Sequence, residues 1–201
     1  MGWEKRGKDV IKNADVKVRR AVDCRQLRWP AQATSYPGYG WNREYENLRG
    51  ECSWRRAERA LEYEVAAVEG HAANAEVLEE CPDEDYDEYF DYLLGLDLGI
   101  ASCVIALNAA GCITHSSCNG GVFGNHHHEE YPLVALFAKR LIVPVLLACA
   151  EASGAGLENE GGGGVQVYAD DVRKMTGFAG ELLNRRKQLS ATRCRASKET
   201  I

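Results

Sequence analysis

Residues 97–121, DLGIASCVIALNAAGCITHSSCNGG, contain the pattern that decides the fold. Asp97 is a typical N-cap, and apolar residues recur at helical spacing over 100–107, so a buried helix is expected here. Gly111 suits the position just after a helix, where a left-handed residue ends it. Residues 112–117 then predict a short strand that runs into a polar loop. The stretch therefore predicts a helix followed directly by a strand.

The elements that follow alternate in a way that defines the fold class. They are a wholly apolar and therefore central strand at 133–137, a helix at 143–153 with Pro144 in its first turn and Gly154 at its end, a hairpin of 155–158 and 165–168 around the glycines 161–164, and a last helix capped by Asp170 or Asp171. The order predicts an α+β fold, with helices packed on one face of a mostly antiparallel sheet.

The rest of the chain divides by composition. Residues 1–52 form a basic, aromatic-rich N-terminal arm or small subdomain without clear periodicity. Residues 53–96 are an acidic helical segment, in which Ser53 caps a helix that Pro82 ends and a second helix begins. We expect the α+β core domain over 97–189 and a flexible basic tail over 190–201.

Overall composition is typical of a globular protein, with 45% hydrophobic and 27% charged residues among 201. The longest apolar run, 133–150, is broken by Lys139, Arg140 and Pro144, so no membrane-spanning helix is expected. The first residues are polar and lack an apolar signal core, which favours a cytoplasmic protein.

Charge is strongly segregated along the chain. Residues 1–60 have a net charge of +6, residues 61–100 of −13 and residues 173–201 of +6. The basic ends could contact the phosphates of RNA or a nucleotide, or fold back on the acidic middle, and the intramolecular interpretation is favoured. Aromatic residues of the arm interleave with arginine, which suits base stacking as well as burial; they are Trp3, Trp29, Tyr36, Tyr39 and Trp41.

The most unusual segment is the expected polar loop that follows the first strand. Such a loop can form a nest of N–H groups for an anion or an oxyanion hole beside a nucleophile, although a plain polar turn has the same composition. Cys118 and His115 are the candidates nearest the chemistry, and in a regular strand these two side chains face opposite sides. The ligand-binding candidates are Thr114, Ser116, Ser117, Asn119, Gly120 and Gly121.

A histidine cluster follows at 126–128. Neutral imidazole is the commonest metal ligand, and His126 and His128 share a side if the chain is extended, so a divalent metal is one hypothesis. An exposed loop without a metal is the alternative. No two of the eight cysteines form a CxxC pair that would strengthen the metal hypothesis.

At Asp97-Leu-Gly-Ile100, Asn108 and Thr114-x-Ser-Ser-Cys-Asn-Gly120 the chain resembles the tRNA wybutosine-synthesis methyltransferase family that acts after the tricyclic base is built. The resemblance covers about residues 90–188 and implies S-adenosylmethionine as cofactor and RNA as partner. The family has Ser where Asn119 stands and Arg where Gly121 stands. A Ser-Cys-x-Gly-His loop in small uncharacterised prokaryotic and phage proteins is similar too.

Three hypotheses about function follow. In the first, the Ser-Ser-Cys-Asn-Gly-Gly loop binds a nucleotide-like or anionic ligand, and the protein modifies RNA or a nucleotide by methyl transfer. In the second, it is a non-enzymatic accessory protein that docks a protein partner through its acidic helices at 61–94. In the third, it binds a metal through the histidine cluster.

Overall fold

Five strands form one sheet in the computed structural model, which describes residues 14–30, 48–73, 93–121 and 129–198. The strand order is β1-β4-β5-β3-β2, and every pairing is antiparallel except the parallel pair of β1 and β4. The predicted α+β class with a mostly antiparallel sheet is therefore confirmed. The strands are β1 (Arg20–Ala21), β2 (Ile113–Asn119), β3 (Pro132–Phe137), β4 (Gly156–Asn159) and β5 (Val165–Tyr168).

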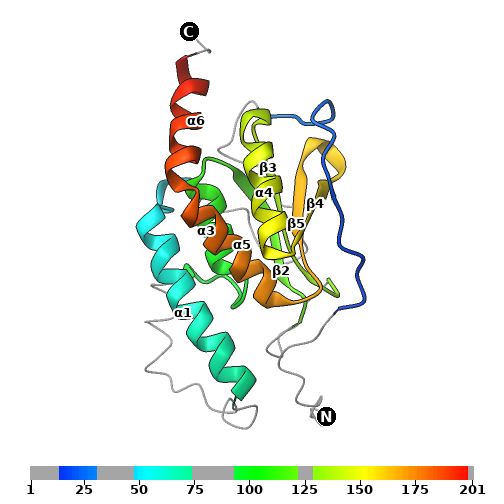
Figure 1. The fold of residues 1–201 in the computed structure, drawn as a ribbon, viewed down its shortest axis with the longest axis vertical. Helices are drawn as coiled ribbons and strands as arrows, with labels where there is room; N and C mark the ends of the chain where they lie inside the picture. Colours follow the sequence, from blue (N-terminus) through cyan, green and yellow to red (C-terminus); the bar gives the residue numbers. More distant parts are fainter. Residues whose placement is uncertain (1–13, 31–47, 74–92, 122–128, 199–201) are drawn as a thin grey trace.

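The helices lie on one face of this sheet (Figure 1). Helices α3 (Ala101–Ala109), α4 (Val143–Ser153) and α5 (Val172–Asn184) contact the strands, and α1 (Trp54–Ala73) packs against α3 and α5. Strand residues that alternate along β3 and β5, such as Val134 and Val167, belong to the same buried cluster as these helices. We call this side of the sheet the helix face and the opposite side the outer face.

Most expected helix boundaries are confirmed. Ser53 caps α1, because its hydroxyl accepts a hydrogen bond from the Arg56 N–H at 3.2 Å. Helix α4 begins with Pro144 in its first turn and ends at Gly154, which has φ 77°. The Asp171 carboxylate caps α5 by accepting from the Arg173 N–H at 2.8 Å. The helix expected to begin at Pro82 lies mostly outside the described residues.

The end of α3 also agrees with the sequence. Gly111 has φ 92°, its N–H donates to the Asn108 carbonyl at 2.9 Å, and the Cys112 N–H donates to the Leu107 carbonyl at 3.0 Å. These two bonds make a Schellman motif, in which a left-handed residue lets the chain satisfy the last carbonyls of the helix. The motif turns the chain directly into β2, as the pattern predicted.

The start of α3 differs from the prediction. The helix begins at Ala101, so its N-cap position is Ile100 and not Asp97. The carboxylate of Glu64, from the neighbouring helix α1, takes this role instead: it accepts the N–H groups of Gly99 at 2.7 Å, Ala101 at 2.9 Å and Ser102 at 2.9 Å. Four N–H groups at a helix start lack partners within the helix, and an anion from elsewhere in the fold satisfies them equally well.

The C-terminal region is more regular than expected. After α5 the chain forms α6 (Arg186–Lys198), so residues 190–198 are helical, where the sequence suggested a frayed tail. In Figure 1 this helix rises away from the sheet. Leu189 anchors its first part, because its side chain is fully buried in the main hydrophobic cluster.

Residues 14–30 form a strap along the β4 edge of the sheet (Figure 1). The Leu157 N–H donates to the Arg19 carbonyl at 2.8 Å, and the Asn159 side chain exchanges two hydrogen bonds with the Asp23 backbone, at 2.6 and 3.2 Å. Only two strap residues are in strand β1, at a position the sequence did not indicate. The strap ends beside the tip of the β4–β5 hairpin.

Candidate functional site

Strand β2 extends through the segment expected to be a loop. The sequence placed the end of the strand at Ser117, whereas the structure continues it to Asn119. Extended backbone sends alternate side chains to opposite faces of a sheet, so one candidate site cannot gather all these residues. Pairing with β3 puts Ser117 opposite Val134 on the helix face and Cys118 opposite Leu133 on the outer face.

The candidates on the helix face have structural partners. Thr114 is buried, and its hydroxyl accepts a hydrogen bond from the Asn108 side chain at 2.7 Å. The same amide of Asn108 donates to the Val104 carbonyl at 2.9 Å. Asn119 is also buried and donates to the Leu98 carbonyl at 3.1 Å. These contacts tie α3 and the residues before it to β2.

The two glycines form a tight turn after β2. Both have positive φ, 74° at Gly120 and 77° at Gly121. The Gly120 N–H lies 3.4 Å from the Cys118 sulfur, and the Gly121 N–H donates to the Asn119 side-chain oxygen at 3.2 Å. The donors that an anion nest needs are therefore engaged within the turn. In this conformation the turn does not fit the carboxylate of S-adenosylmethionine or the phosphate of a nucleotide.

His115 occupies a bulge in β2. Thr114 pairs with Leu136 and Ser116 with Ala135, so His115 is an extra residue in the strand. Because of the bulge, the regular alternation that would place the side chains of positions 115 and 118 on opposite faces of the sheet does not hold here. The His115 ring lies 4.9 Å from that of Phe137, whose strand register places it on the outer face with Cys118.

Glu160 is the charged neighbour of His115 on this face. The His115 Nε2 atom lies 3.2 Å from the Glu160 Oε2 atom, and both atoms are buried. Glu160 comes just before the glycine tip of the β4–β5 hairpin, η4 (Gly161–Gly163). The pair therefore joins the bulge of β2 to the base of that tip.

The other buried thiols are poor nucleophiles. Cys103, Cys112 and Cys149 are fully buried in the main cluster. Burial raises the pKa of Cys112 to about 12 and that of Cys149 to about 11, and it raises the pKa of Cys103 well above its ordinary value. Because only the thiolate attacks or binds metal readily, these three side chains act as small apolar groups.

The metal hypothesis falls mainly on residues that are not described. His126 and His128 lie in the segment 122–128, outside the described residues. Within the part of the chain that the structure describes, no three His, Cys, Asp or Glu side chains come close enough to hold a metal ion.

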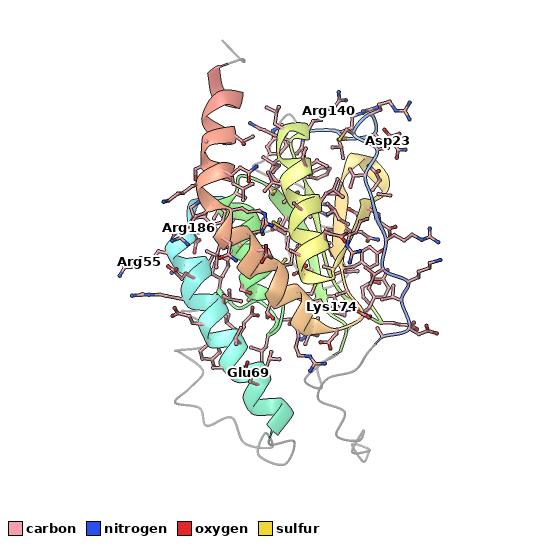
Figure 2. The ribbon with its side chains drawn as sticks, viewed as in Figure 1. Asp23, Arg55, Glu69, Arg140, Lys174 and Arg186 are labelled. Carbon is pink, nitrogen blue, oxygen red and sulfur yellow. The ribbon has the colours of Figure 1, made fainter. Side chains whose placement is uncertain are left out.

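A group of exposed cations lies at the end of the sheet that carries the hairpin tip. Arg25 and Arg28 come from the strap, and Lys139 and Arg140 from the chain between β3 and α4. In Figure 2, Arg140 lies at the same end as Asp23, whereas Lys174 lies far from both. Only Arg25 has a carboxylate partner among the described residues, Asp23, at 3.0 Å. We call these four side chains together with Trp29 the basic end.

Trp29 connects the two halves of the basic end. Its side chain is 38% exposed, which is unusual for tryptophan, and the Lys139 Nζ atom lies 5.3 Å from its ring centroid. A cation over an indole face is attracted by the ring quadrupole. The strap thus presents an aromatic ring in the middle of an otherwise cationic surface.

The N-terminus of α4 adds a partial positive charge at the same place. Helix α4 has no side-chain cap and no acidic residue in its first turn, and Arg140 is in the 3-10 turn η3 (Arg140–Ile142) just before it. The N-terminal end of an 11-residue helix carries about half a positive elementary charge, which strengthens the field of the neighbouring cations.

Basic segments elsewhere fold back on acidic residues, in part as the sequence favoured. Arg20 pairs with Glu151 at 3.4 Å, and Arg186 pairs with Glu58 at 3.8 Å. Glu151 lies in the acidic middle of the chain, between the two basic ends, whereas Glu58 lies before it, so one of these two pairs has the kind of partner that the sequence favoured. The basic end lacks such neutralisation at Arg28, Lys139 and Arg140 within the described segments.

Sequence reasoning identified one half of the basic end. The arginines that interleave with Trp29 gave a signal, whereas Lys139 and Arg140 were seen only as an interruption of an apolar run. Nothing in the order of residues indicates that segments more than a hundred positions apart meet, because strand pairing and the strap bring them together.

Comparisons with known proteins return no relative. No family model, no curated protein and no solved structure matches the chain. No helix among the described residues has both the length and the apolar character needed to cross a membrane.

Proposed function

We propose that this protein binds nucleic acid and that the basic end holds its phosphate backbone. The observation that carries the proposal is the meeting of two cationic segments, 25–28 and 139–140, beside the N-terminus of α4, which has no side-chain cap. Nucleic acid presents regularly spaced phosphates that engage several cations at once and release counterions. The surface suits such a polyanion better than a single small anion.

Two features of the sequence support the same class of partner. Aromatic and arginine residues interleave along the N-terminal arm, a combination that suits contact with bases and phosphates. The motif at positions 114–120 resembles that of a family that acts on tRNA. The motif supports RNA binding rather than methyl transfer, because Gly121 stands where the family motif has a cation and the turn uses its own amides.

The test is a salt titration of binding to a fluorescently labelled oligoribonucleotide. Each phosphate contact with a single strand lowers the slope of log affinity against log salt by about 0.7. We expect Arg28→Gln and Arg140→Gln each to weaken binding and to make that slope shallower by about 0.7. Glutamine keeps most of the aliphatic stem, so the change removes charge more than packing.

Lys174→Gln is the matched control. This lysine lies at the other end of the helix layer (Figure 2) and is bonded to Asp170 at 2.6 Å. Its replacement should leave both affinity and salt slope unchanged. An equal loss in all three variants, or a wild-type protein without salt-dependent binding, would refute the proposal and favour an accessory protein that docks through its acidic helices.

A further inference from the structure

We infer that the basic end takes single-stranded rather than duplex nucleic acid, with one unpaired base stacked on Trp29. The inference rests on the proposed function and adds to it the class of nucleic acid that binds. Trp29 is an exposed aromatic side chain that follows Arg28 in the strap, and Lys139 of the β3–α4 connection lies over its ring. Phosphate contacts alone would not require an indole there.

The reason for a single strand is geometric. A base inside a duplex already has a neighbour on each of its faces, so it offers no face to an aromatic side chain. An unpaired base does, and stacking on tryptophan tolerates any base because each has a π-face. Lys139 at 5.3 Å from the ring centroid is also placed to reach the phosphate next to a base that stacks there.

The hairpin tip holds the backbone that carries this ring. The Arg28 N–H donates to the Gly163 carbonyl at 3.0 Å, which holds the residue just before Trp29. A Cβ atom on Gly163 would lie 2.5 Å from the Cγ atom of Arg28, and Gly163 has φ 96°. Gly163 is therefore a positioning residue: only glycine lets the tip approach the strap so closely.

Leu27 completes this arrangement from the other side. Its side chain is 5% exposed and belongs to the main hydrophobic cluster. The backbone just before Trp29 is thereby held at two successive residues, at Leu27 by the core and at Arg28 by the hairpin. A pre-positioned ring loses less conformational entropy when a base stacks on it than a mobile one would.

The first experiment compares three ligands of one sequence: a single strand, its duplex, and a single strand with abasic positions throughout. We expect the wild-type protein to bind the single strand most tightly. Trp29→Ala should reduce that affinity about tenfold, the range expected for one stacked base, and leave the abasic and duplex affinities unchanged. Trp29→Phe should keep most of the single-strand affinity that Trp29→Ala loses.

The second experiment uses the three glycines of the tip. Alanine at Gly163 would clash with Arg28 and would also have to adopt a positive φ. Alanine at Gly162 would only have to adopt a positive φ, 77°. Alanine at Gly161 would face neither problem, since nothing lies within 4 Å of its Cβ position. We expect Gly163→Ala to lower single-strand affinity as much as Trp29→Ala does, and Gly161→Ala to have no effect. The Trp29 indole NMR signal should shift only in Gly163→Ala.

The outcomes separate this inference from the proposed function. Equal affinity for single strand and duplex, with salt dependence and sensitivity to Arg140→Gln retained, would overturn the role of Trp29 and leave the phosphate contacts standing. A wild-type protein that binds none of the three ligands would overturn both. An indole signal that does not move in Gly163→Ala would overturn the positioning role alone.

Discussion

The side chain of Glu64 in α1 holds the start of helix α3. Its carboxylate is fully buried and takes three backbone N–H groups at the start of α3. Burial raises the pKa of this carboxyl, and the hydrogen bonds from Ser102, Ala101 and Gly99 oppose the rise without cancelling it. The residue links α1 to α3 through polar contacts inside an otherwise apolar layer.

Replacing Glu64 with glutamine should destabilise the protein by about 1–3 kcal/mol, because the new amide turns a donor toward the Ser102 N–H. The loss should also depend on pH. A carboxyl whose pKa is higher in the folded state contributes its full stability below its ordinary value of 4.5, and that contribution falls as pH rises. Urea unfolding of both proteins from about pH 4 to about pH 7 should therefore show a shrinking difference.

The control for this measurement is Glu69→Gln, an exposed position further along α1 (Figure 2). This change should alter stability by less than about 0.5 kcal/mol across the same pH range. A difference between wild type and Glu64→Gln that stays constant with pH would show that the buried carboxyl does not titrate as its surroundings imply.

At the scale of one connection, the turn that follows β2 depends on Gly120. A Cβ atom there would lie 2.7 Å from the carbonyl carbon of Tyr131 and 2.8 Å from the Pro132 nitrogen, which are backbone atoms that cannot move aside cheaply. Gly120→Ala should therefore destabilise the β2–β3 pair by about 2–4 kcal/mol, as judged from thermal unfolding.

Gly162→Ala separates the two causes of that loss. Gly162 has φ 77°, close to the 74° of Gly120, but nothing lies within 4 Å of its Cβ position. Gly162→Ala should therefore lower the free energy of unfolding by only about 1 kcal/mol, the strain of an alanine in the left-handed region. Equal losses in the two variants would mean that the contact with Tyr131 and Pro132 is unimportant.

The elements were predictable where their determinants are local. Gly111 and Asp171 end or begin helices through bonds to residues close by in sequence, and Gly154 ends one through its own left-handed backbone. A pattern of residue types therefore suffices to find them. The start of α3 was mispredicted because its cap, Glu64, lies 35 residues before the first N–H group that it binds. Asp97 has the residue type of a cap, but it lies three residues before Ile100, the N-cap position of α3, and the Glu64 carboxylate binds the N–H groups there instead.

The candidate site was less predictable than the fold for the same reason. The bulge at His115 depends on which β3 residues pair with Thr114 and Ser116, and sequence alone does not give that register. The meeting of Trp29 with Lys139 depends on the strap crossing the end of the sheet. Both features belong to tertiary structure, and neither has a local motif.

Over the whole molecule, Arg20 ties the strap to the helix layer. Its Nε atom donates to the carbonyls of Ala150 at 3.1 Å and Ala155 at 2.8 Å, at the end of α4. Arg20→Ala should remove about 1–2 kcal/mol and lower the melting temperature by about 2–8 °C. Arg55→Ala, at an exposed position on α1, is the control and should change neither.

Limited proteolysis gives a second measurement of the same effect. The strap carries several basic residues that trypsin recognises, and pairing with β4 protects the backbone around Arg20. Arg20→Ala should speed cleavage within residues 14–30 at temperatures well below unfolding. Unchanged cleavage there would mean that the backbone pairing with Leu157 alone holds the strap in place.

The parallel pairing of β1 with β4 has a consequence for the order of events on the ribosome. Leu157, the strand partner of Arg20, is made 137 residues after it, so the strap has no sheet edge to join until β4 has emerged. Synthesis at the usual rate leaves those residues waiting for about ten seconds. The basic end is therefore assembled only after β4 has been made, and a product truncated before β4 would carry its arginines without the geometry that makes them a binding surface.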